Sequence, residues 1–168
     1  MMTLLTLLSI LLAAAYVVAA TWVRGELPGS ISALVYTLSR PWQWVWIIWM
    51  WAVAFTACIP LIEVMPSDLG KGLAFLTLVC LMFVGGMPVT ERENSRAHSL
   101  FGVSAGVVSQ VCVLLLCPVW LWAWLAYVAL IVYVAAYPSD KLFAGKGVLI
   151  AELICAASTI GAVLTTLM

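Results

Sequence analysis

Six long apolar runs constrain this chain more than any other feature. They cover roughly residues 3–23, 42–64, 72–90, 98–117, 118–137 and 147–167. Each run has about the 20 residues that a helix needs to cross the hydrocarbon core of a bilayer, whereas a barrel strand would show about ten residues of alternating polarity. Of the 168 residues, 66% are apolar and 8% are charged, which lies far outside the composition of soluble domains. The sequence therefore predicts an all-α, polytopic membrane protein with a six-helix transmembrane bundle.

The bundle is expected to form a single transmembrane domain over residues 1–168, because six spans leave no room for a soluble domain. The boundary at Cys117-Pro118 is placed on two grounds. The roughly 40 apolar residues from His98 to Tyr137 are too many for one crossing, and proline is well tolerated in the first turn of a helix.

The lysine and arginine residues predict how the bundle is oriented. With six spans, the first, third and fifth loops share one side and hold every basic residue of the chain except Lys71. Short loops rich in positive charge stay in the cytoplasm. We therefore expect a multi-pass protein of the cell membrane, the inner membrane in a Gram-negative bacterium, with both termini outside the cytoplasm. A formal net charge of zero offers no basic surface for nucleic acid, so the lipid bilayer is the expected partner.

The first loop, between Arg24 and Pro41, is predicted to contain a short interfacial helix. Ser30 follows a Pro-Gly pair and is a suitable N-cap. Apolar residues then recur at helical spacing, at positions 31, 34, 35 and 38. Such a segment is expected to lie on the cytoplasmic face of the bundle, and the alternative is a plain amphipathic connector.

Two features of the predicted spans concern packing as much as function. Trp42, Trp46 and Trp49 share one helical stripe of the second span, which either lines a cavity for a lipid or flat apolar ligand or consists of lipid-facing or packed aromatic residues. Gln110 is an amide in the middle of the fourth span, where an interhelical hydrogen bond is the favoured interpretation.

Polar and ionisable residues concentrate at the predicted cytoplasmic end. Glu152 lies about five residues, or roughly 8 Å, inside the sixth span, where a carboxylate is costly unless it is paired or hydrated. His98 opens the fourth span on the same side. We therefore predict a polar ligand pocket in the cytoplasmic half of the bundle. Its candidate residues are His98, Glu152, Ser30, Ser32, Tyr36, Asn94, Arg96 and Ser109.

Two resemblances accompany these residues. The segments "SISALVY" (30–36) and "FVGGMP" (83–88), with a histidine opening the next helix, resemble a group of small multi-pass membrane proteins of gut bacteria of the Bacteroidetes type. In that group the first motif reads SIS-x-x-Y-Y, and here Val35 stands at the first tyrosine position. The resemblance implies a multi-pass membrane protein and no particular activity.

The second resemblance concerns Glu91, Asn94 and His98, which are similar to the E-x-x-N-x-x-x-H pattern in the progestin and adipoQ receptor branch of the ceramidase-like membrane hydrolases. Those proteins hold zinc with three histidines, and this chain has one. The resemblance therefore implies, if any metal binds, a substitute site built from His98, Glu152 and an aspartate or cysteine.

Three classes of function remain open from the sequence. The favoured one is binding or transport of a lipid-like or small ligand, because intramembrane ionisable residues often mark ligand or proton paths. The others are a membrane-embedded, metal-dependent lipid hydrolase and a structural or accessory membrane subunit. No H-E-x-x-H, phosphate-loop or dinucleotide pattern is present, so no cofactor is evident and catalysis stays an open question.

Overall fold

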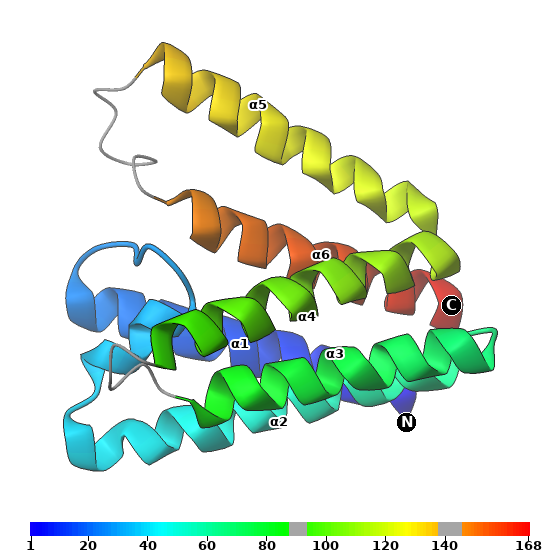
Figure 1. Cartoon of the computed structure of the whole chain (residues 1–168), viewed down its shortest axis with the longest axis horizontal. Coiled ribbons are helices and arrows are strands. Elements are labelled where there is room, and N and C mark those ends of the chain that lie inside the picture. The colour runs from blue at the N-terminus through cyan, green and yellow to red at the C-terminus, as the bar shows by residue number, and fades with distance from the viewer. Residues whose placement is uncertain (88–93, 138–145) are drawn as a thin grey trace.

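The computed structural model in Figure 1 describes residues 1–87, 94–137 and 146–168. The side chains of six further residues lie outside this description: Ala20, Leu34, Tyr36, Thr37, Asn94 and Ser95. Within the described ranges the chain has no strand, and six of its helices are long and apolar enough to cross a membrane. The predicted all-α, six-helix architecture is confirmed, and the chain is an integral membrane protein.

The spanning helices are α1 (Met2–Arg24), α2 (Gln43–Val64), α3 (Asp68–Gly86), α4 (Asn94–Leu116), α5 (Ala123–Ala136) and α6 (Gly147–Leu167). Three short 3-10 helices precede or join them: η1 (Ser32–Thr37), η2 (Arg40–Trp42) and η3 (Pro118–Trp122). η2 continues into α2 and η3 into α5, so the second span covers Arg40–Val64 and the fifth covers Pro118–Ala136. The spanning helices alternate in direction, so the N- and C-termini lie at the same end (Figure 1). We call the opposite end the basic end, because Arg24, Arg40, Arg96 and Lys146 all lie there.

Local chemistry explains where the observed boundaries differ from the predicted ones. α3 begins at Asp68, four residues before the predicted start at 72, because the Ser67 hydroxyl accepts a hydrogen bond from the backbone N–H of Gly70 at 3.1 Å. The carboxylate of Asp68 in the first turn also suits the positive end of the helix dipole. The expected break before Pro118 is present, since Cys117 separates α4 from η3.

The helices pack around a core of small and branched side chains. α3 packs between α2 and α4, and α6 packs against α4. One almost fully buried residue from each of these four helices meets in a single cluster: Leu61, Ala74, Cys112 and Val163. α5 differs, because none of its residues is buried and it diverges from α6 toward its C-terminal end (Figure 1).

The tryptophan stripe of the second span packs against α1. Trp46 is 1% exposed, and Trp49 stacks on Tyr16 with ring centroids 4.1 Å apart and planes at 22°. The Trp49 indole donates a hydrogen bond to the carbonyl of Leu12 at 2.8 Å. Trp42 lies outside the stripe, in η2, and is exposed. Trp46 and Trp49 are therefore packed aromatic residues and do not form the wall of a cavity.

Candidate functional site

Glu152, the outstanding polar residue of the sixth span, faces the first loop. Its Oε2 accepts a hydrogen bond from the backbone N–H of Ile31 at 2.5 Å. Ser30 and Ser32, on either side of Ile31, have hydroxyl oxygens 3.1 Å apart. Three of the predicted pocket residues are thus brought together. The hydrogen bond to a backbone amide offsets part of the cost of placing this carboxyl group within a span.

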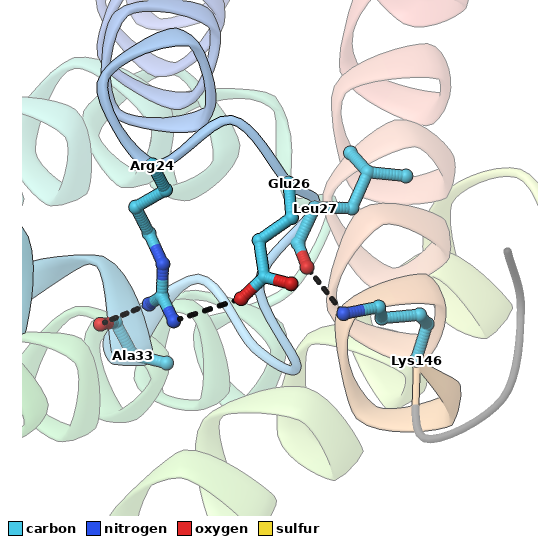
Figure 2. Close-up of polar contacts among 5 residues, drawn as sticks. All are labelled: Arg24, Glu26, Leu27, Ala33 and Lys146. Carbon is cyan, nitrogen blue, oxygen red and sulfur yellow. Dashed lines mark hydrogen bonds and ion pairs between the residues drawn. The ribbon is translucent and has the colours of Figure 1, made fainter. Parts of the chain in front are cut away.

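Two further contacts fasten the first loop to the start of α6. The backbone N–H of Leu149 donates to the carbonyl of Gly29 at 3.0 Å. The Lys146 ammonium donates to the carbonyl of Leu27, as Figure 2 shows. Lys146, the N-cap of α6, is followed at three-residue spacing by Leu149 and Glu152 in the first two turns of this helix, so the three residues lie near one another on its surface. The loop therefore lies over the N-terminal turns of this helix.

The other side of the loop is held by α1. Arg24 donates to the carbonyl of Ala33 at 3.3 Å and forms an ion pair with Glu26 at 3.6 Å (Figure 2). The Ser30 hydroxyl accepts a hydrogen bond from the backbone N–H of Ala33 at 3.1 Å, although the residue at the N-cap position of the loop helix is Ile31 and not Ser30 as predicted. The helix that follows is 3-10 rather than α, and Val35 within it is 2% exposed and packs in a cluster with Trp46. The loop helix is thus anchored in the bundle.

His98 makes its hydrogen bond elsewhere. Its Nδ1 lies 3.1 Å from the carbonyl oxygen of Met87, just past the end of α3. Arg96 is exposed, and residues two apart on a helix point to nearly opposite sides. The hydrogen bonds of His98 and Glu152 therefore go to different partners, both on the main chain, and no direct hydrogen bond joins these two side chains. Tyr36 and Asn94 cannot be placed in the pocket, because their side chains lie outside the described part of the chain.

Ser109 belongs to a third polar group, in the middle of the bundle. Gln110 Oε1 accepts hydrogen bonds from Ser158 of α6 at 2.8 Å and from the indole of Trp124 of α5 at 3.0 Å. Gln110 Nε2 donates to the Ser109 hydroxyl at 3.2 Å and to the carbonyl of Cys155 at 3.4 Å. The predicted interhelical hydrogen bond of Gln110 is confirmed. Both ends of the amide are satisfied by protein groups, as expected of a residue that joins helices.

Neither a serine nucleophile elbow at residues 102–106 nor a cluster of metal ligands is assembled among the residues that the structure describes. Residues 102–106 read GVSAG, the spacing of a serine nucleophile elbow, but they lie inside the continuous helix α4 instead of a strand-turn-helix. A Cβ added at Gly106 would lie 3.5 Å from Cys155 Sγ, and one added at Gly102 would lie 3.9 Å from Val84 Cγ2, so both glycines face neighbouring helices at ordinary contact distance. Across the described ranges no three His, Cys, Asp or Glu side chains gather to hold a metal ion. Glu91 and Asp140 lie outside those ranges.

An apolar groove lies between α2 and α3, toward the basic end. Its volume is about 470 Å³. The α3 wall contains residues at helical spacing, and Trp51 of α2 forms the facing wall. The lining residues are Trp51, Val79, Met82, Phe83, Gly86 and Met87. Sequence reasoning missed this groove, although "FVGGMP" contains its last residues.

The aromatic walls of the groove are held by neighbouring groups. The Trp51 indole donates to the carbonyl of Met82 at 3.0 Å, and a methyl group added at Gly86 would lie 3.9 Å from the Trp51 ring. Phe83 stacks on Phe101 of α4 with centroids 4.6 Å apart and planes at 15°. The groove is therefore preformed. Met87, at its end, is also the residue whose carbonyl binds His98, so the ring of His98 lies close to that end.

Comparison with known proteins adds no relative. The chain matches no protein-family model, no curated protein and no solved structure. The class that the fold defines is an integral, multi-pass membrane protein, and its function has to be argued from its own residues.

Proposed function

We propose that this protein binds a membrane lipid and holds one acyl chain in the groove between α2 and α3. The observation that carries the proposal is the position of the groove: a preformed, apolar concavity within the spanning part of two helices. Trp51 and Phe83 in its walls are 39% and 44% exposed, so they are accessible from the side where bilayer chains lie. The predicted function of lipid binding is kept, but the residues that carry it are apolar.

The dimensions suit an acyl chain. A volume of about 470 Å³ falls within the range of about 300–1,000 Å³ that is usual for small-molecule sites. The wall from Val79 to Met87 runs for roughly 12 Å at 1.5 Å per residue. The groove therefore accommodates a segment of chain and leaves the polar part of the lipid beyond Met87.

Packing, and not the hydrophobic effect, must retain the lipid. Bilayer chains are as apolar as the groove, so moving a chain into it removes no apolar surface from water. The gain comes from dispersion contacts with rings that are already held in place, while a bulk lipid chain meets mobile neighbours. Because Trp51 is fixed by its hydrogen bond to Met82 and Phe83 by its stacking on Phe101, binding orders few protein groups.

Photolabelling of the purified protein in lipid nanodiscs tests the proposal. A phospholipid with a diazirine on one acyl chain is expected to label the groove residues preferentially. Gly86→Leu places a side chain into the groove and should reduce this labelling severalfold. Gly72→Leu is the matched control, because it adds the same side chain to α3 where nothing lies within 4 Å of the new Cβ.

Both variants should keep the helical circular dichroism and the gel-filtration position of the parent protein. Labels spread evenly over exposed apolar residues such as Leu76 and Val103, with no effect of Gly86→Leu, would show ordinary bilayer contact and overturn the proposal.

A further inference from the structure

Building on the proposed lipid groove, we infer that His98 selects the head group of the bound lipid. Its free ring nitrogen accepts a hydrogen bond from a head group that carries an N–H or O–H donor. Phosphatidylethanolamine satisfies this requirement, and phosphatidylcholine, whose quaternary nitrogen has no hydrogen, does not.

The hydrogen bond to Met87 determines what His98 offers. A carbonyl oxygen only accepts, so the Nδ1 of His98, 3.1 Å away, carries the hydrogen and donates it. In the neutral ring Nε2 then holds a lone pair and acts as an acceptor. The two nitrogens point in different directions from the ring, so Nε2 faces away from Met87. The main chain thereby fixes both the tautomer and the orientation of the imidazole.

The ring also lies at the depth where a head group would be. α3 ends at Gly86 and α4 begins at Asn94, so His98 is within about one turn of the end of its helix. An acyl chain seated between Val79 and Met87 would bring its polar part to this end of the groove. His98 is half-buried, whereas Arg96 is exposed and points to the opposite side of α4. The His98 imidazole is therefore a polar side chain that is hydrogen-bonded to a residue lining the groove, Met87.

Selection follows from the cost of leaving an acceptor without a partner. His98 is half-buried as a residue, and a ring nitrogen that loses its contact with water on lipid binding needs a donor in exchange. A typical neutral hydrogen bond contributes enough to change affinity by about threefold to tenfold. Ethanolamine and glycerol head groups supply the donor, so both should be retained more strongly than choline by a factor of this size.

A methylation series separates hydrogen bonding from charge and bulk. Phospholipids with identical acyl chains carry ethanolamine, its monomethyl and dimethyl forms, and choline; all are zwitterions, and only choline lacks an N–H. Retention on the purified protein, measured by native mass spectrometry from nanodiscs, should fall about threefold to tenfold at the last methylation. A gradual decline along the series, or equal retention throughout, would overturn the inference.

Two variants of His98 complete the test. His98→Phe keeps a ring and removes both nitrogens, so it should bind every member of the series equally. His98→Gln keeps a donor for Met87 and an acceptor for the lipid, so it should retain part of the preference. A wild-type preference that persists in His98→Phe would refute the role of the imidazole. Failure of the proposed function would give a different result: lipid retention would be the same in the Gly86→Leu variant as in the parent protein.

Discussion

Replacing Gly85 with alanine should weaken the contact between α2 and α3, while the same change at Gly86 should be tolerated. A Cβ at Gly85 would lie 2.8 Å from Met50 Cγ and 2.9 Å from Met50 Cβ. Met50 Cβ is attached directly to the backbone, so the two helices must move apart to relieve the overlap. At Gly86 the nearest atom is Cζ2 of Trp51 at 3.9 Å, which is an ordinary contact. Neighbouring glycines thus predict opposite outcomes.

The size of the effect follows from two opposing contributions. Overpacking of a close interface costs about 1–3 kcal/mol, and alanine regains about 0.5–1 kcal/mol over glycine inside a helix. Gly85→Ala should therefore lower the free energy of unfolding by about 1–2 kcal/mol, whereas Gly86→Ala, which creates no overlap, should leave it unchanged or raise it by up to about 1 kcal/mol.

Titration of the protein in mixed micelles with SDS, followed by far-ultraviolet circular dichroism, measures both values. Tryptophan fluorescence provides a second probe, since Trp51 lies at the same interface. An unfolding free energy for Gly85→Ala equal to or above that of Gly86→Ala would refute the close approach of α2 and α3.

Three further predictions concern the polar contacts and the orientation. Gln110→Leu removes the acceptor shared by two helices and should cost about 1–2 kcal/mol in the same SDS titration, with a smaller loss for Ser158→Ala; no loss for Gln110→Leu would show that the cluster is incidental. Glu152→Leu leaves the Ile31 amide without its acceptor and should cost about 1–3 kcal/mol, while Glu152→Gln keeps an acceptor and should lose about 1 kcal/mol or less; equal losses would mean that the carboxylate is not held by this bond. A reporter active only in the cytoplasm should work when inserted near Ser95 and fail after Met168, and the opposite pattern would reverse the predicted polarity.

The architecture was predictable because the bilayer limits what an apolar run can become. Runs of about 20 apolar residues have few alternatives to a spanning helix, since backbone groups in hydrocarbon must satisfy one another. The same reasoning located the break before Pro118 and the last span, 147–167, which coincides with α6. Helix starts were less predictable. The cap at Ser67 is a polar residue outside the apolar run, and it extends α3 by about one turn beyond the predicted start.

The partners of His98 and Glu152 were not predictable from depth. Two residues at one level of a bundle can lie on helices that face different neighbours, and the apolar pattern of a run does not determine which helix it meets. At the ends of helices the main chain also offers free amides and carbonyls. Ile31 and Met87 supplied such groups, and backbone atoms leave no signal in the residue types. The interhelical hydrogen bond of Gln110 was easier to predict, since the middle of a bundle offers few partners other than side chains of facing helices.

The groove could not be predicted from the sequence for a related reason: its space exists because Gly86 has no side chain. In "FVGGMP" the two glycines are 100° apart on the helix, so they face different surroundings. Gly85 lets α2 approach until only hydrogen fits, and Gly86 leaves open the space beside Trp51. A pair of glycines at the end of one span, opposite a tryptophan of another, therefore combines a tight contact with an adjoining cavity. Because the two positions face different surroundings, Gly86→Leu should fill the groove without disturbing the contact made at Gly85.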